Sequence, residues 1–205
     1  MKRHLLLFGS LAGLLFFGTV YALAVAVPGY SHVSDTVSEI GQVGSPVERL
    51  FQVAMLAVDL SIVAFGLGLF YFARSREASI VPAAFVAYFG LVEIGLHLYP
   101  SPHPLHNVFG LSLTIGYLAP LTLAISWRHL ASASALVNAS WLATALILIS
   151  IFLNISPLFT RDLFPLEYYG IVQRSAHVLF FGWCAYASIR CFLSSDSRIM
   201  RELPA

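Results

Sequence analysis

Side chains that could carry out chemistry are few in this chain, and most fall toward one end of its apolar segments. Carboxylate, imidazole and guanidinium groups transfer protons, hold metal ions and bind anions. Five of the seven histidines belong to this end. The candidate site residues are Ser38, Glu39, Asp59, Glu93, His97, His103, His106, Asn107, Gln173, Arg174 and His177.

The histidines suggest a metal site. Three imidazole ligands with an open coordination position would make a catalytic zinc site, or a site for another transition metal. Glu93 or Glu39 could then serve as the base or as a further ligand. Haem held by His177 with His97 or His106 is a second possibility, and a third is that neighbouring hydrogen bonds satisfy these rings without a metal. The candidate metal ligands are His97, His103, His106 and His177.

Ionisable groups inside the apolar segments must be compensated, because each costs at least about 2.5–3.5 kcal/mol on insertion scales. By depth, Glu93 and Arg174 are the easiest pair to bring together. Arg174 beside Gln173 could instead bind an anionic head group. Asp59 could relay protons or could pair with a hydroxyl such as that of Ser112 or Thr114.

Ser38 and Glu39 lie between the first two apolar segments. Glu39 could act as a general base or metal ligand over the mouth of a site. Thr36 and Glu39 also have the spacing of a helix capping box, in which each side chain bonds to the other residue's backbone N–H. Both interpretations stay open at this point.

The elements that must position these residues follow from composition. The 205 residues are 59% hydrophobic and 10% charged, with a mean hydropathy of +0.83. These values exclude a soluble domain, a disordered chain and a nucleic-acid binder, and they indicate an integral membrane protein. Only helices satisfy the backbone in such segments, since the period-2 alternation of a barrel is missing. We expect one all-α domain over residues 1–205, a six-transmembrane-helix bundle with spans near 5–27, 48–72, 80–98, 106–127, 133–154 and 168–192.

Lysine and arginine predict the orientation. Eight of the eleven fall on one side of the predicted spans, and basic residues favour the cytoplasmic side. Both termini are therefore expected in the cytoplasm, with the candidate residues at the extracytoplasmic side. The eight are Lys2, Arg3, Arg74, Arg76, Arg128, Arg190, Arg198 and Arg201.

Three segments resemble the bacterial membrane family called domain of unknown function 998. Tyr30-Ser-His-Val-Ser-Asp-Thr-Val-Ser-Glu-Ile-Gly41, followed by Gly44-Ser-Pro46, is similar to its outer-loop signature. Gly95-Leu-His-Leu-Tyr-Pro100 through His106-Asn107 falls where the family has Gly-x-Phe-Pro-x-Asp and a following His, although Ser101 replaces that Asp. Gly170-Ile-Val-Gln-Arg174 resembles its Gly-x-x-Gln-Arg segment. The resemblance implies a six-span protein of the bacterial inner membrane without an established activity.

Two classes of function remain open. The first is a membrane-embedded hydrolase or transferase acting on a lipid-like, amphipathic substrate. Its catalytic residues would be Glu39, Glu93, Arg174 and His177, and its substrate-binding residues Ser38, Asp59, Asn107 and Gln173. The second is a protein that binds or transports a lipid, small molecule or ion without chemistry, and a further alternative is a haem-binding electron-transfer protein. In both, the partners are membrane lipids and a small molecule.

Overall fold

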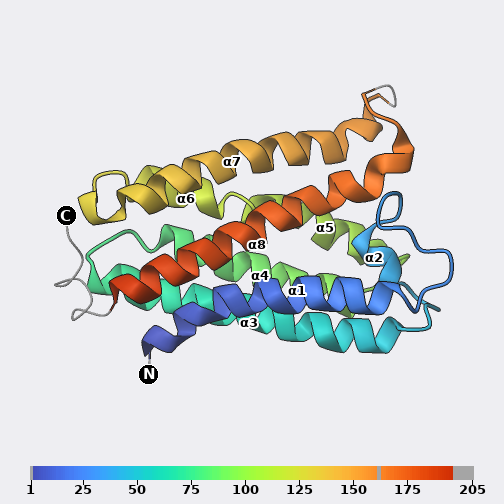
Figure 1. Cartoon of the computed structure of the whole chain (residues 1–205), viewed down its shortest axis with the longest axis horizontal. Helices are drawn as coiled ribbons and strands as arrows, with labels where there is room; N and C mark the ends of the chain where they lie inside the picture. Colours follow the sequence, from blue (N-terminus) through green and yellow to red (C-terminus); the bar gives the residue numbers. More distant parts are fainter. Residues whose placement is uncertain (1, 161–162, 196–205) are drawn as a thin grey trace.

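The computed structural model describes residues 2–160 and 163–195, and this part of the chain is helical without a strand. Six helices are long and apolar enough to cross a membrane, which confirms the predicted all-α, six-helix class. Figure 1 shows the bundle. A 3₁₀ turn, Lys2–Leu7, leads into the first helix, and the elements that follow are α1 (Phe8–Ala24), α2 (Val37–Ile40), α3 (Glu48–Ser75), α4 (Val81–Leu98), α5 (Pro104–Gly116), α6 (Ala119–Ser126), α7 (Ser134–Ile155) and α8 (Tyr169–Ser194).

The helices pack around an aromatic core. α3 lies against α1 and α4, α4 against α5, and α8 against α1 and α7. The rings of Phe89 and Phe180 stack with centroids 4.0 Å apart, and Phe181 lies beside both. Gly90 lets α4 approach α3 closely, because a Cβ there would lie 2.9 Å from the carbonyl oxygen of Asp59. Small residues permit such close helix contacts where lipid offers no hydrophobic driving force.

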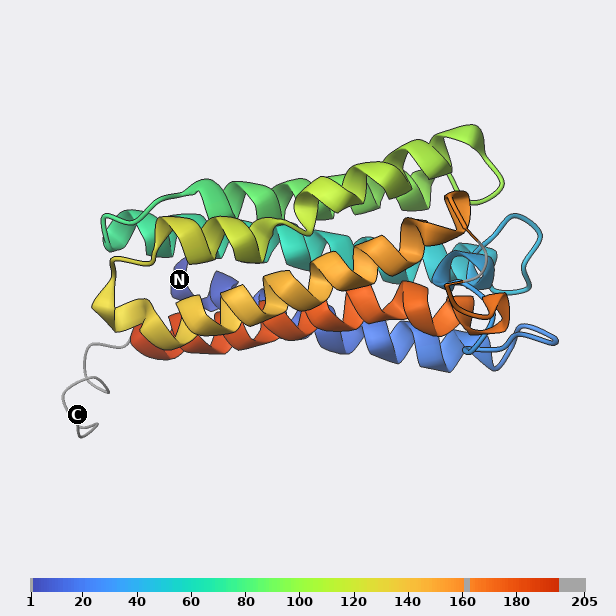
Figure 2. The same cartoon turned by 90° about the horizontal axis from the view of Figure 1, so that it is seen from above.

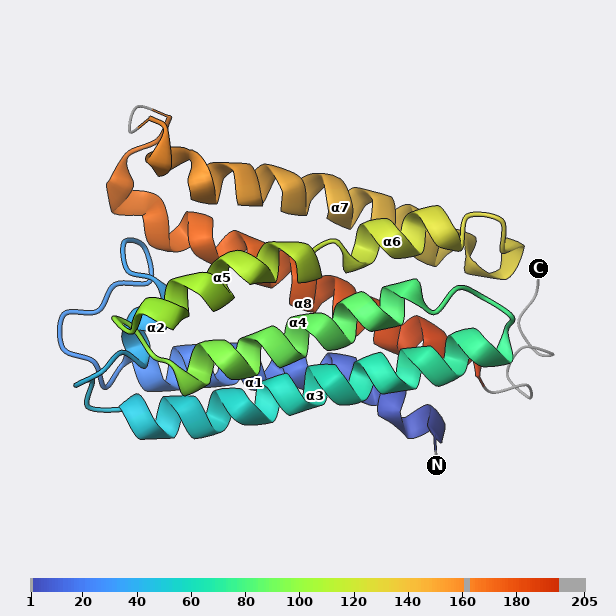
Figure 3. The same ribbon diagram turned by 180° about the vertical axis from the view of Figure 1, so that it is seen from behind.

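The fourth span is divided, whereas the sequence predicts one helix over 106–127. α5 ends at Gly116 and α6 begins at Ala119. Pro120 lacks the backbone N–H that would continue the hydrogen-bond ladder. At the break the side chain of Tyr117 is buried against Phe89 and Phe180. α6 packs against α7, but α5 and α7 diverge toward the end that carries α2 (Figure 2 and Figure 3).

The two ends of the bundle differ in charge. The 3₁₀ turn Lys2–Leu7 and the last turn of α8 lie at the same end of the bundle. There Arg76 donates a hydrogen bond to the carbonyl oxygen of Ser194, and His4 contacts Phe192. Most of the eight basic residues gather there, and Arg198 and Arg201 lie outside the described residues. The other end carries the segment 25–47, hereafter the outer loop, with α2 inside it (Figure 1).

Candidate functional site

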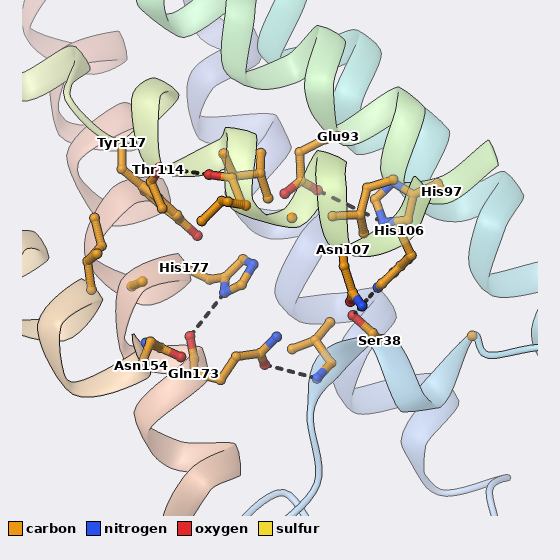
Figure 4. Close-up of a pocket in the computed structure, with 18 of the residues that line it drawn as sticks. Ser38, Glu93, His97, His106, Asn107, Thr114, Tyr117, Asn154, Gln173 and His177 are labelled. Atoms are coloured by element: carbon orange, nitrogen blue, oxygen red, sulfur yellow. Dashed lines mark hydrogen bonds and ion pairs between the residues drawn. The ribbon is translucent and has the colours of Figure 1, made fainter. Parts of the chain in front are cut away.

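A cavity of about 430 Å³ lies at the outer-loop end, between α4, α5, α7 and α8. Seven of the eleven candidate residues line it: Ser38, Glu93, His97, His106, Asn107, Gln173 and His177. It is also lined by the polar groups of four residues that were not among the candidates: Gln52, Thr114, Tyr117 and Asn154. Figure 4 shows these side chains, apart from that of Gln52, around a shared space. The signal in the sequence was an amide side chain inside or at the end of a predicted span, as Asn154 is at the end of the span 133–154.

A buried cluster forms one wall of this cavity. Glu93 and His97 are one turn apart on α4, and Nε2 of His97 lies 3.9 Å from a Glu93 oxygen. Behind His97, a carboxylate oxygen of Asp59 on α3 accepts a hydrogen bond from Nδ1 at 2.9 Å. Asp59 is 1% exposed and Glu93 4%. A carboxylate that bonds to one imidazole nitrogen fixes the tautomer and orientation of the ring, so Asp59 aims the opposite nitrogen of His97 toward Glu93.

The Asp59–His97 contact shows that α3 is offset along its axis from α4. Gly66, eighteen residues after the start of α3, lies against Ala87, eleven residues before the end of α4. At 1.5 Å per residue, α3 therefore begins about 10 Å beyond the end of α4, and the side chains of Asp59 and His97 cover the remaining distance between them. Depth counted from each helix end places Asp59 near the midplane and so hides this contact.

The predicted four-histidine metal site is not formed. His106 bonds through Nδ1 to the carbonyl oxygen of Tyr99 at 3.0 Å and through Nε2 to the hydroxyl of Ser38 at 3.1 Å. Both of its nitrogens are engaged, which also removes it from the haem pairing.

Two other histidines of the predicted metal site, His103 and His177, also have partners within the protein. His103 is exposed and caps α5, accepting from the backbone N–H of Leu105 at 3.2 Å. His177 stacks on Phe16 and its Nδ1 contacts the carbonyl oxygen of Gln173 at 3.2 Å. Over the described ranges, the one group of His, Cys, Asp and Glu placed to hold a metal is Asp59, Glu93 and His97.

Arg174 does not pair with Glu93, so this prediction is wrong. Its Nη1 donates to the carbonyl oxygens of His32 and Asp35, each at 2.7 Å, and to that of Gly170 at 2.9 Å. Its Nη2 donates to the hydroxyl of Tyr30. The outer loop reaches the guanidinium first, because it folds over the start of α8.

The neighbours of Arg174 complete this attachment. The side-chain oxygen of Gln173 accepts a bond from the N–H of Val37 at 3.0 Å. A Cβ at position 170 would lie 2.5 Å from the Asp35 carbonyl oxygen, so glycine is needed for the close approach. The Gly-x-x-Gln-Arg segment therefore ties the outer loop to α8, and Arg174 lies outside the cavity lining.

Glu39 belongs to a capping box, as one of the two interpretations predicts. Thr36 is the N-cap of α2, and a Glu39 oxygen accepts from its backbone N–H at 2.5 Å. Glu39 does not line the cavity. Its role in the structure is to hold α2, which places Ser38 against His106 at the cavity rim.

Arg174 and the outer-loop groups that it bonds, hereafter the clamp, lie in surroundings that shift the pKa values of three loop residues. Burial raises the pKa of Tyr30 to about 12, so its hydroxyl stays protonated and donates to the Thr36 carbonyl oxygen at 2.9 Å. Burial, with a smaller effect of Arg174, lowers the pKa of His32. Hydrogen bonds from the Ser31 N–H and the Ser34 hydroxyl lower the pKa of Asp35. The fold therefore favours neutral His32 and ionised Asp35.

The fold and the polar cavity define a multi-pass helical membrane protein with a buried carboxylate–imidazole cluster. A family model described as "Protein of unknown function (DUF998)" matches residues 10–190, and the chain belongs to this family. The resemblance found in the three sequence segments is confirmed. Neither the curated proteins nor the solved structures that were searched gave a match.

Proposed function

We propose that this protein is a membrane-embedded hydrolase or transferase acting on a lipid-like substrate with an uncharged polar head group. The observation that carries the proposal is the pair Glu93 and His97, buried in the cavity wall with Asp59 behind the ring. In this proposal the protein lies in the bacterial inner membrane with both termini in the cytoplasm, and the cavity faces the extracytoplasmic leaflet.

The position of the cavity favours a substrate that enters from the bilayer. The cavity lining includes residues of α5 and α7, the two helices that diverge at this end (Figure 3). Leu111 on α5 and Leu158, in the turn that follows α7, both line the cavity and are 68% and 80% exposed. Exposed leucines at the edge of a cavity suit acyl chains, so the tail would lie between α5 and α7 while the head group reaches the cluster.

The chemistry of the lining favours an uncharged head group. Amides and hydroxyls dominate its polar part, and none of the lining residues is a lysine or arginine. Arg174, which the sequence suggested as a binder of an anionic head group, is instead bonded to the outer loop. An anionic head group would leave a charge without a partner in a poorly solvated site. Neutral polyol, amide or ester groups would instead match the lining of Gln52, Asn107, Thr114, Asn154 and Gln173.

The cluster can activate a water molecule or a substrate hydroxyl. Its oxygen would attack a carbonyl carbon of the substrate while its proton passes to the cluster formed by Glu93 and His97. The bond from that carbon to the leaving oxygen or nitrogen then breaks, and the proton returns to the leaving group. With water the reaction is hydrolysis, and with a hydroxyl it is acyl transfer. Loss of a positioned proton acceptor costs about 10²–10⁴-fold in rate.

The test is lipid turnover by the full chain in nanodiscs. Diacylglycerol, ceramide and neutral glycolipids would be supplied separately, with phosphatidylglycerol as an anionic comparison, and products followed by mass spectrometry. We expect turnover of a neutral lipid and a loss of at least about 10²-fold in His97→Gln. The control is His103→Gln, on the exposed turn before α5. Binding of a neutral lipid without turnover would refute the enzyme and support the non-catalytic lipid-binding alternative.

A further inference from the structure

We propose that Asp59, Glu93 and His97 together bind one divalent transition-metal ion at the inner wall of the cavity. This inference deepens the proposed function and rests on it for the role of the ion in chemistry, but the binding itself does not require any enzymatic activity. Each of the three residues offers one ligand atom, and these atoms lie within 4.8 Å of one another.

The charges of the cluster argue for a cation. Two carboxylates lie close together in a span region where both are almost fully buried. Among the described residues, the charged or imidazole partner within 4 Å of either carboxylate is His97 alone. Burial disfavours the ionised form of a carboxyl group unless an opposite charge lies beside it. One divalent ion neutralises both, while the neutral imidazole supplies a nitrogen ligand.

The hydrogen bonds of Asp59 give a second, independent indication. One of its oxygens accepts from His97, but Oδ1 is buried without a hydrogen-bond partner. The side chain has no exposed surface. Buried polar atoms nearly always have a partner, so an unpartnered carboxylate oxygen inside the cluster calls for a ligand that the protein's own side chains do not provide.

The geometry is close to that of a metal site. Ligand atoms about 2.1 Å from a tetrahedral ion lie about 3.4 Å from each other. An ion shared by all three residues would take the place of the proton between Nδ1 of His97 and the Asp59 oxygen, which lie 2.9 Å apart. One ligand atom of each residue lies within 4.8 Å of the others, so a shift of about 1 Å, chiefly of Glu93, brings the set into the range of a metal site. Glu93 and His97 also line the cavity. The cavity side of the ion would therefore keep an open position for water or substrate, as catalytic sites require.

The ligand set indicates the class of metal. Carboxylate oxygens with one imidazole nitrogen, and no thiolate, suit zinc, iron or manganese. The two cysteines do not belong to the cluster, since both are free and buried in α8. Zinc serves as the probe below, and cobalt as its spectroscopic substitute.

The test measures metal content without reference to activity. The full chain, carrying an affinity tag free of histidine, is purified from medium supplemented with zinc, washed with a weak chelator and analysed for metals. We expect about one ion per chain, and absorption bands of bound cobalt when Co²⁺ is titrated into metal-stripped protein. Glu93→Gln and His97→Gln should lower metal content at least tenfold, whereas the exposed control His103→Gln should retain it.

A second measurement avoids variants that fail to fold. Stripping zinc from the wild-type chain with a strong chelator should lower its midpoint of thermal unfolding, and zinc alone should restore it. A wild-type chain with less than a tenth of an ion, no cobalt spectrum and no response to chelator would overturn the inference. Metal binding without lipid turnover would leave this inference standing and refute the proposed function. Turnover that depends on His97 in metal-free protein would do the reverse.

Discussion

Replacing Arg174 by methionine removes the clamp between α8 and the outer loop while keeping most of the side chain's length. The loss includes the bonds to the carbonyl oxygens of His32 and Asp35 and to the hydroxyl of Tyr30. The contact with the Gly170 carbonyl oxygen matters less, because that oxygen belongs to the same helix. We therefore expect release of the loop without unfolding of the bundle.

The magnitude follows from these three bonds. A hydrogen bond to a charged group contributes about 1.5–3 kcal/mol, and an ordinary one about 1 kcal/mol net. The loop groups can bond to water once the loop is released, so each of the three bonds is taken at about 1 kcal/mol. Their sum is about 3 kcal/mol. At 1.4 kcal/mol per factor of ten, the population of the released loop should rise roughly 150-fold. The released population in Arg174→Lys should fall between those of the wild type and Arg174→Met, because one ammonium group cannot reproduce the planar fork of the guanidinium.

Amide hydrogen exchange of residues 25–47 measures this population directly. Exchange there should accelerate about 100-fold in Arg174→Met, while the central amides of α8 keep their protection. Arg49→Met is the matched control, because Arg49 is exposed at the same end of the bundle. An acceleration below about fivefold, or equal acceleration in the centre of α8, would refute the reasoning.

Two further predictions concern the same end of the protein. Gly170→Ala should destabilise the outer loop by about 1–3 kcal/mol, because its Cβ would press on the Asp35 carbonyl oxygen, whereas Gly182→Ala, with open space at its Cβ, should be neutral or slightly stabilising; thermal unfolding with loop-specific exchange distinguishes them. Acidification should also release the loop. The lowered pKa of His32 means that the released loop takes up a proton first as pH falls below about 6.5, and the lowered pKa of Asp35 adds a second loss near pH 4 and below. Protease sensitivity of the loop against pH should show both steps, with the upper one absent in His32→Asn and the lower one absent in Asp35→Asn; a flat profile between pH 8 and 4 would contradict the assignment.

Local features of the sequence were enough to predict the membrane-spanning helices and one helix cap. Apolar runs of about 20 residues leave no alternative to a helix, since backbone groups in lipid must be satisfied within the segment. The Thr36–Glu39 capping box also depends on residues three apart, and the structure confirms it. These inferences succeeded because their physical causes act over a few neighbouring residues.

The cavity was predictable only in outline. Polar groups at one end of several spans indicated that they face a shared space, and seven of the eleven candidates do line it. Which of them meet was not predictable by counting from helix ends. Arg174 illustrates this, because its partners are carbonyl oxygens that every residue carries and that no sequence pattern distinguishes.

The cluster itself was decided by tertiary structure. Glu93 and His97 share a helix face, which their spacing predicts. Asp59 joins them because α3 is offset from α4 by about 10 Å, and Gly90 allows the two helices to approach closely. The sequence by itself therefore determined the spans, their number and the end of the bundle that holds the polar groups. The packing of α3 against α4 and of the outer loop over α8 decided which polar groups touch, because helix offset and loop path depend on contacts between residues far apart in the chain.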